Sequence, residues 1–230
     1  MKAILLAAGM GTRLRPITIK TPKPLIKIKG ETIIERQIKF LREIGIDEII
    51  VVTGYLKDKF EFLKEKYGVK IIQNDMYDKY NNIYTMYLVK DYLKDTYVIE
   101  GDIYLNKNFL KGNIEKSSYF SAPKYGFNDE WMLEVGNDNR VIGIEEGSED
   151  GRYIMCGVSY WNNEDGDYIV KKLEERVVDG DFTKLFWDHV VKDNIKKLDI
   201  RLEKLEADDV YEIDSLMDLK YIEEKLECGI

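Results

Sequence analysis

The sequence predicts an α/β protein with a mostly parallel or mixed central sheet, helices on both faces and a small antiparallel portion. Up to about residue 100, short apolar runs alternate with helical periodicities, which is typical of parallel strands joined by crossover helices. After about residue 112 this alternation ends, and strand-like segments follow one another. These two patterns predict one domain in which a parallel half continues into a mixed or antiparallel half.

Each element is predicted from its own pattern. The run 2–7 is apolar without alternation, as expected of a strand covered on both faces, and 32–44 has the periodicity of an amphipathic helix. The strands expected are 2–7, 48–53, 69–73, 96–100, 119–122, 131–135, 141–145, 153–161 and 198–205. The helices expected are 32–44, 56–67, 82–90, 165–178, 183–192 and 215–226.

The composition restricts the ligands and metals that the protein can bind. A net charge of −8 argues against a nucleic-acid duplex or an anionic membrane as partner, because both demand a dense basic face. The single histidine, His189, rules out multi-histidine metal sites, so a divalent metal has to bind carboxylates, as Mg²⁺ does. The two cysteines, Cys156 and Cys228, have no metal-like spacing, and we expect a cytoplasmic protein.

A glycine-rich loop, 7–13, follows the first strand. Its glycines let backbone N–H groups approach an anion closely, and Arg13 adds donors that fit phosphate oxygens. Lys23 lies between two prolines and can offer a fixed positive charge. A lone Gly-x-Gly is a weak signal; the dinucleotide fingerprint fails at Leu14, and the Gly-Lys-Ser/Thr of a P-loop is absent.

The apolar strand, Ala-Ala-Gly-x-Gly-x-Arg and Thr-Pro-Lys-Pro-Leu at 21–25 together resemble the nucleotidyltransferase family that includes sugar-nucleotide pyrophosphorylases. The resemblance implies a Rossmann-like, GT-A-like fold in which the loop wraps a triphosphate that arginine and lysine neutralise. We therefore expect Arg13, Lys23 and Asp102 to be catalytic. The nucleotide-binding residues expected are Ala7, Ala8, Gly9, Gly11, Arg13, Lys23, Gly54, Tyr55, Asn81 and Asn82.

Two aspartates are candidate metal ligands. Asp102 closes the strand 96–100, at the edge where open parallel sheets gather their ligands, and Asp214 precedes the last helix. Asp102 could instead belong to a turn, Asp214 could cap the helix, and Glu212 could be surface charge. The family resemblance favours the metal, since members hold Mg²⁺ with an aspartate at each of these places.

A narrower resemblance covers essentially the whole chain. The segments 80–84, 128–131, 186–188 and 211–214 look like those of bacterial CTP:phosphocholine cytidylyltransferases. This resemblance implies transfer of CMP from CTP to phosphocholine, with residues 1–112 as the nucleotide-binding half and 113–230 as the acceptor-binding half. CTP and phosphocholine would be the partners, and the oligomeric state is not predicted.

A quaternary ammonium makes no conventional hydrogen bonds and is bound by aromatic faces and negative charge. The candidate walls are Trp131, Phe186 and Trp187, with Asp188 as the counter-charge. Family members commonly have tyrosine where this chain has Phe186. Any of these aromatic residues could instead be part of the core.

Several alternatives stay open. Asn81 and Asn82 could contact the nucleotide, or Asn82 could cap the helix that follows. The same chemistry could act on phosphoethanolamine, 2-aminoethylphosphonate or a sugar 1-phosphate, the first two of which would prefer carboxylates to aromatic walls. A glycosyltransferase of similar architecture would want Asp-x-Asp after the central strand, and Glu100-Gly101-Asp102 is a near miss. A non-catalytic nucleotide-binding module would be expected to lose Lys23 or the aspartates, all of which this chain keeps.

Overall fold

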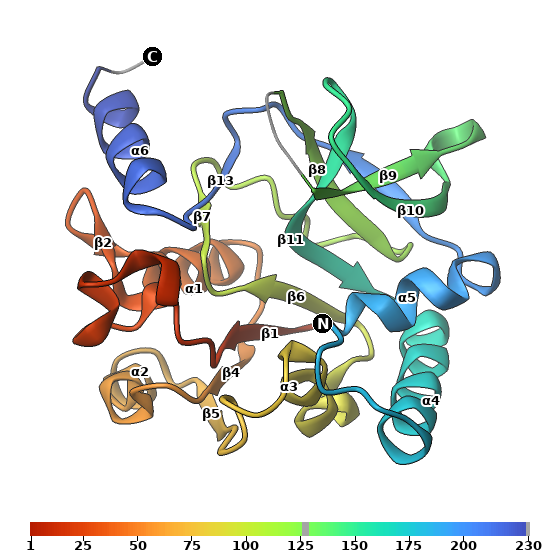
Figure 1. Ribbon diagram of the computed structural model, residues 1–230, viewed down its shortest axis with the longest axis horizontal. Helices are drawn as coiled ribbons and strands as arrows, with labels where there is room; N and C mark the ends of the chain where they lie inside the picture. The colour runs from red at the N-terminus through yellow and green to blue at the C-terminus, as the bar shows by residue number, and fades with distance from the viewer. Residues whose placement is uncertain (126–128, 229–230) are drawn as a thin grey trace.

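The computed structural model describes residues 1–125 and 129–228, without the side chains of the last two (Figure 1). Asn128 and the Cys228 side chain, both used above, lie outside the described residues. The main sheet is 9-stranded, in the order β10-β9-β11-β6-β1-β4-β5, with β8 pairing to β11 and β12. Its strands are β1 (Lys2–Ala7), β4 (Glu48–Thr53), β5 (Lys70–Gln73), β6 (Thr96–Glu100), β8 (Ser118–Pro123), β9 (Glu130–Val135), β10 (Val141–Gly147), β11 (Tyr153–Trp161) and β12 (Arg201–Lys204).

Helices cover both faces of this sheet (Figure 1). They are α1 (Ile33–Glu43), α2 (Phe62–Tyr67), α3 (Asn82–Leu88), α4 (Asn163–Asp179), α5 (Asp188–Asn194) and α6 (Leu216–Cys228). A lipid bilayer could not be crossed by any helix in the described residues, since none has both the length and the apolar character that this requires.

Strand β1 divides the core because its side chains alternate between the two faces. Ala3 and Leu5 belong to the core under α1 and α2, and Ile4 and Leu6 belong to the core under α3, α4 and α5. This double burial explains why the run 2–7 is apolar at every position except its first.

The sheet is parallel on one side and largely antiparallel on the other. β1 pairs in parallel with β4 and β6, and β4 pairs in parallel with β5. β11 is antiparallel to β6, β8 and β9, and β9 is antiparallel to β10. The predicted α/β fold with a mixed sheet, helices on both faces and an antiparallel portion is confirmed. One sheet spans both parts. The division into a nucleotide-binding half and an acceptor-binding half near residue 112 stays a prediction.

Two predicted helices were wrong in part. Segment 56–67 forms a 3₁₀ turn (Lys57–Phe60) followed by α2, and Leu56 is outside the turn because it lies in the left-handed region with φ 50°. Segment 183–192 is helical only from Asp188. Before it, backbone groups of 183–187 bond to Asn81 and Asn82 instead of to one another, so tertiary hydrogen bonds replace helical ones.

Two small sheets were not predicted from the sequence. One joins β2 (Lys27–Ile28) to β3 (Glu31–Thr32). The other joins β7 (Ile103–Leu105) to β13 (Val210–Glu212) in antiparallel register, with Ile103 opposite Glu212. Asp102 directly precedes β7 and Asp214 lies just beyond β13, so this pairing brings two distant aspartates together. The Ile213 N–H donates to the Asp102 carbonyl at 3.2 Å and closes the pair.

Candidate active site

Two neighbouring cavities share one wall. The first, which we call the loop cavity, has a volume of about 310 Å³ and is lined by the loop after β1. The second, the aromatic cavity, has a volume of about 380 Å³ and is lined by Trp131, Phe186 and Trp187 among others. The residues common to both linings are Arg13, Glu100, Asp102 and Asp214. A molecule in each cavity would therefore meet the other at a group of carboxylates.

The loop after β1 forms much of the loop cavity, with Ala7, Ala8, Gly9 and Gly11 in the lining. Gly11 has φ 57°, a left-handed conformation in which its carbonyl accepts a hydrogen bond from Thr18 Oγ1 at 2.7 Å. A Cβ at Gly11 would stand 3.1 Å from Thr18 and 3.2 Å from Lys23 Cβ. The conformation therefore favours glycine here, and a Cβ would also press on Thr18 and Lys23.

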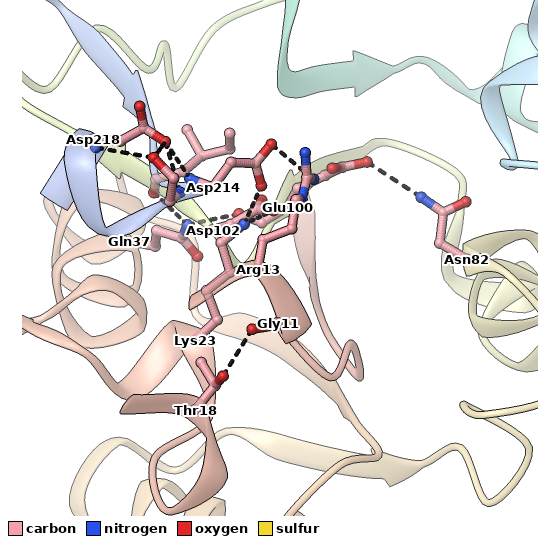
Figure 2. Close-up of polar contacts among 12 residues, drawn as sticks. Gly11, Arg13, Thr18, Lys23, Gln37, Asn82, Glu100, Asp102, Asp214 and Asp218 are labelled. Atoms are coloured by element: carbon pink, nitrogen blue, oxygen red, sulfur yellow. Dashed lines mark hydrogen bonds and ion pairs between the residues drawn. The ribbon is translucent and has the colours of Figure 1, made fainter. Parts of the chain in front are cut away.

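Lys23 lines the loop cavity and points toward the two aspartates of the shared wall (Figure 2). Its buried ammonium donates to Asp102 Oδ2 at 2.8 Å and to Asp214 Oδ1 at 2.6 Å, while Arg13 reaches Asp214 Oδ2 at 2.8 Å. Burial opposes the charge of Lys23, but the two aspartates outweigh it and raise its pKa. Burial likewise opposes ionisation of Asp214, but Lys23 and Arg13 hold its pKa below the usual range. These shifts favour the charged forms of both Lys23 and Asp214.

The turn that presents Asp102 is rigid. The buried side chain of Gln37, on α1, donates to the carbonyls of Glu100 at 2.9 Å and Ile103 at 2.7 Å. A Cβ at Gly101 would stand 2.7 Å from Pro24 and 2.8 Å from the Leu6 carbonyl, so that only glycine lets the turn pack this closely. The backbone of Asp102 is therefore held in place by its neighbours, in addition to the bond between its side chain and Lys23.

Asp214 does not cap the helix that follows it. Ser215 Oγ accepts from Asp218 N–H at 3.2 Å, and Asp218 accepts from Ser215 N–H at 2.7 Å, which is a reciprocal cap. The Asp214 carboxylate faces Lys23 and Arg13 instead. The capping alternative is thus not supported, and the carboxylate is free to act in the site.

Three carboxylates could hold a metal ion: oxygens of Asp102, Glu212 and Asp214 lie within 4.8 Å of one another. Asp102 Oδ1 is buried and has no hydrogen-bond partner among the described residues, which suits an oxygen that binds a metal ion. Such an all-oxygen set fits a hard cation of the Mg²⁺ type. Solvent reaches Glu212 from the cleft, yet crowding by protein atoms and the charges of Asp102 and Asp214 raise its pKa to about 8. A cation would remove that penalty.

The predicted nucleotide residues separate into two groups. Asn81 and Asn82 line the loop cavity with the glycine loop. Gly54 and Tyr55 are not among the lining residues: they pack behind the loop, where Tyr55 N–H donates to the Ala8 carbonyl at 3.1 Å. A Cβ at Gly54 would stand 2.7 Å from Tyr77, so this glycine supports the loop.

The aromatic cavity has an open side built from the rings of Trp131 and Phe186, and the His189 ring packs against both. Phe186 is 43% exposed and lies edge-on to Trp131 at 6.2 Å. His189 stacks on Phe186 at 5.9 Å and meets Trp131 edge-on at 4.7 Å, while its Nδ1 accepts from Phe186 N–H at 3.0 Å. The only histidine of the chain thus supports the two rings. Lys192 Nζ lies 5.0 Å from the Trp131 ring centre, so this ring already attracts a cation.

Trp187 and Asp188 form the closed side. Trp187 is 2% exposed and packs edge-on against Trp161 at 5.6 Å, so the core alternative fits it better than a free wall. Asp188 is also buried and accepts from the Tyr119 hydroxyl at 2.9 Å. Loss of hydration raises the pKa of Asp188 to about 7 although the Tyr119 hydrogen bond opposes this. A cation in the cavity would favour its ionised form.

The structure adds residues that the sequence analysis missed. Glu100 lies in the shared wall, where burial and then Asp102, Asp188 and Glu212 raise its pKa well above the usual range. The other additions to the two linings include Glu212, Glu130, Tyr119, Tyr77, Tyr80 and Thr85. Tyr80, Glu130 and Glu212 lie within segments that carry the family resemblance, and Glu100 directly precedes Gly101-Asp102, so these four had a usable signal in the sequence. Tyr77, Thr85 and Tyr119 had none.

The arrangement defines a class of protein. A cationic glycine loop, a carboxylate cluster at the ends of parallel strands and an adjoining second cavity are the parts that nucleotidyl transfer needs. The sequence profile of the nucleotidyl transferase family matches residues 2–225. The chain belongs to this family.

Individual relatives are similar over nearly their whole length. A choline-phosphate cytidylyltransferase of Streptococcus pneumoniae is 48% identical over 99% of this chain and 99% of its own. The solved structure of the CTP:phosphocholine cytidylyltransferase from Streptococcus pneumoniae superposes with a TM-score of 0.95, covering 98% of both chains at 48% identity. A 2-aminoethylphosphonate cytidylyltransferase of Lancefieldella rimae is 34% identical over 94% of this chain and 89% of its own.

Proposed function

We propose that this chain transfers CMP from CTP to phosphocholine, giving CDP-choline and pyrophosphate. The observation that carries the proposal is the pair of cavities that meet at Asp102 and Asp214: one offers a cationic glycine loop, the other aromatic rings and a buried acid. Whole-length similarity to a choline-phosphate cytidylyltransferase supports the pair of substrates.

In this arrangement CTP occupies the loop cavity with its phosphates along residues 7–13. Backbone N–H groups of the loop, Arg13 and Lys23 neutralise the triphosphate. Phosphocholine occupies the aromatic cavity, with its trimethylammonium group against Trp131, Phe186 and Asp188. Its phosphate then points to the shared wall, where the α-phosphate of CTP lies.

The reaction needs no general base, because the phosphate of phosphocholine is already an anion at neutral pH. One of its oxygens attacks the α-phosphorus in line; a P–O bond forms there, and the bond to the bridging oxygen of the β-phosphate breaks. Pyrophosphate leaves with the electron pair, and Lys23 and Arg13 stabilise its charge. Catalysis consists of positioning and charge neutralisation.

Asp102 and Asp214, with Glu212 beside them, would hold Mg²⁺ at the wall. Bound there, the ion supplies charge neutralisation and orientation at the α-phosphate. In the structure, Lys23 and Arg13 neutralise the charges of the two aspartates. When the ion binds the aspartates, both side chains would turn toward the triphosphate instead. The cysteine content favours the reducing interior of the cell as the place of the reaction.

Other acceptors remain as alternatives to phosphocholine. A primary ammonium, as in 2-aminoethylphosphonate, would seek carboxylates such as Asp188, Glu130 and Glu212, all of which line the aromatic cavity. The exposed rings of Trp131 and Phe186 favour the quaternary ammonium, because an aromatic face compensates a cation that cannot donate hydrogen bonds.

The test is pyrophosphate release with Mg²⁺, in which CTP, UTP, dTTP, ATP and GTP are crossed with phosphocholine, phosphoethanolamine, 2-aminoethylphosphonate and glucose 1-phosphate. We expect turnover with CTP and phosphocholine above all other pairs. Preferred turnover with 2-aminoethylphosphonate would refute the aromatic recognition but keep nucleotidyl transfer. No turnover in any pair would favour a nucleotide-binding module.

A further inference from the structure

The two segments 80–82 and 183–187 form one structural unit although a hundred residues separate them. Asn81 N–H donates to the Thr183 carbonyl at 3.0 Å, and Asn81 Nδ2 donates to the Lys184 carbonyl at 3.3 Å. Trp187 N–H donates to Asn82 Oδ1 at 2.9 Å. The start of α3 therefore holds the segment that carries Phe186 and leads into Asp188.

The amide of Asn82 is bonded at both ends. Its Oδ1 accepts from Trp187 N–H, and its Nδ2 donates to Glu100 Oε1 at 3.3 Å (Figure 2). A backbone N–H can only donate, so the amide oxygen must face Trp187 and the amide nitrogen must face Glu100. The orientation of this side chain is thus fixed by its partners.

These bonds connect the two cavities. Asn82 lines the loop cavity, Glu100 belongs to the shared wall, and Trp187 stands between Phe186 and Asp188 in the lining of the aromatic cavity. Any movement of the 186–188 segment away from the wall has to break a bond to the Asn82 amide. Phe186 itself is 43% exposed and packs against the rings of Trp131 and His189.

We propose that Asn82 is a positioning residue for the acceptor: it fixes the 186–188 segment against the shared wall and thereby makes the affinities for the two substrates depend on each other. The inference rests on the function proposed above. A nucleotide in the loop cavity lies against Asn82 and steadies its amide, which keeps Trp187, Phe186 and Asp188 in place. Thermodynamic linkage requires that phosphocholine in turn tightens the nucleotide by the same factor.

The experiment compares Asn82→Ala with the wild type and with Asn108→Ala. Asn108 is a matched control, since its amide is also bonded at both ends, to the Phe40 carbonyl at 3.1 Å and from Leu110 N–H at 3.3 Å, but lines neither cavity. Steady-state pyrophosphate release gives kcat and the KM of each substrate. Tryptophan fluorescence gives the Kd of phosphocholine with and without a non-hydrolysable CTP analogue.

For Asn82→Ala we expect KM for phosphocholine to rise about tenfold, the size of one lost hydrogen bond, with KM for CTP changed less than about threefold. The CTP analogue should tighten phosphocholine in the wild type and in Asn108→Ala, and should no longer do so in Asn82→Ala. A melting temperature is measured for each variant, because general destabilisation would lower it without abolishing this coupling.

Asn82→Asp is the second variant. It keeps an oxygen toward Trp187 N–H but replaces the donor to Glu100 with another acceptor, so it should lose the coupling while weakening phosphocholine less than alanine does. An unchanged KM for phosphocholine in Asn82→Ala, or an increase confined to KM for CTP, would overturn the inference and assign Asn82 to the nucleotide. If the wild type preferred another acceptor, the function proposed above would fall, and the same comparison with that acceptor would still decide the role of Asn82.

Discussion

The loop cavity and the aromatic cavity are assembled in different ways. The loop cavity takes its cations and two of its glycines, Gly9 and Gly11, from residues 7–23, close together in the chain. The aromatic cavity takes its lining from β6, β8, β9, β11, β13 and the segment before α5. Phosphate oxygens can be met by backbone N–H groups and nearby cations, so a short motif suffices. An organic cation must be surrounded on several sides, which only tertiary structure can achieve.

The two cavities also differ in how their charges are balanced. In the loop cavity Lys23 and Arg13 are paired with Asp102 and Asp214, so each charge has an internal partner. In the aromatic cavity Asp188 has the neutral hydroxyl of Tyr119 as its side-chain partner, and burial raises the pKa of Asp188 to about 7. When ligands bind in the loop cavity, its cations and aspartates therefore have to exchange partners. When an organic cation binds in the aromatic cavity, Asp188 has to become fully ionised.

The largest effect is expected from Asp102→Asn, which removes a metal ligand from the wall common to both cavities. We expect kcat to fall about a thousandfold, since charge stabilisation at a phosphoryl group contributes several kcal/mol. The measurement is pyrophosphate release at saturating CTP and phosphocholine. Asp47→Asn is the control, because Asp47 is exposed and lines neither cavity. Turnover near the wild-type rate in Asp102→Asn would remove this residue from the metal site.

Lys23→Met should come next and should separate the two roles of this lysine. We expect kcat/KM for CTP to fall by about two orders of magnitude, because the leaving group loses a buried cation. Without nucleotide, the same variant should bind Mn²⁺ more tightly than the wild type, since the aspartates lose their internal partner. Calorimetry or electron paramagnetic resonance measures the second quantity.

Lys116→Met is the control for this variant, as Lys116 is paired with Asp199 and lines neither cavity. Weaker Mn²⁺ binding in Lys23→Met than in the wild type would contradict the idea that Lys23 and the metal ion compete for the same aspartates.

A smaller effect, confined to one substrate, is expected from the aromatic rings. Trp131→Ala and Phe186→Ala should each raise KM for phosphocholine about three- to thirtyfold with little change in KM for CTP, since a cation–π contact contributes roughly 0.5–2 kcal/mol. Phe62→Ala is a matched control, with a phenylalanine 39% exposed against 43% for Phe186. An unchanged KM in either variant would remove that ring from the acceptor site.

The smallest effect concerns pH. The pKa of Asp188 is raised to about 7 by burial, and a bound ammonium would favour its ionised form. Affinity for phosphocholine should therefore increase as pH rises from about 6 to 8 and then level off, by at most tenfold per pH unit. The measurement is the Kd of phosphocholine against pH for the wild type and Asp188→Asn.

Asp188→Asn should bind phosphocholine weakly at every pH and lose this dependence. It should also be more stable at pH 8. Because the pKa of Asp188 lies above its unfolded value of about 3.9, the wild type loses stability as pH rises between those two values. An identical pH profile in both proteins would rule out Asp188 as the group that titrates.

Much of the parallel half could be predicted from the sequence. β1, β4 and β6 have the predicted bounds because their side chains are buried on both faces and leave continuous apolar runs. Lys23, Arg13 and the glycines could be assigned to one site since they lie in one short motif. The meeting of Asp102 with Asp214 was expected only from the family resemblance. No local pattern shows it, because it depends on β7 and β13, which have only three residues each.

The errors share a physical cause. Segment 183–187 has helical periodicity but is held by the side chains of Asn81 and Asn82, and a tertiary hydrogen bond leaves no trace in local pattern. Surface charge was left open as an alternative for Glu212, because Asp102, its neighbour in the carboxylate cluster, is distant in the chain. Trp187 could not be told from Phe186 by composition, although one is in the core and the other is exposed.

The wall common to the two cavities has a consequence for how such enzymes diversify. Arg13, Glu100, Asp102 and Asp214 come from residues 1–105 and the chain around β13, whereas the rings around the acceptor come from the stretch between them. Substitutions in that stretch can exchange one acceptor for another while the reacting groups stay where they are. A chimaera in which residues 118–200 of a relative replace those of this chain would keep the reacting groups of this chain and take its acceptor specificity from the relative.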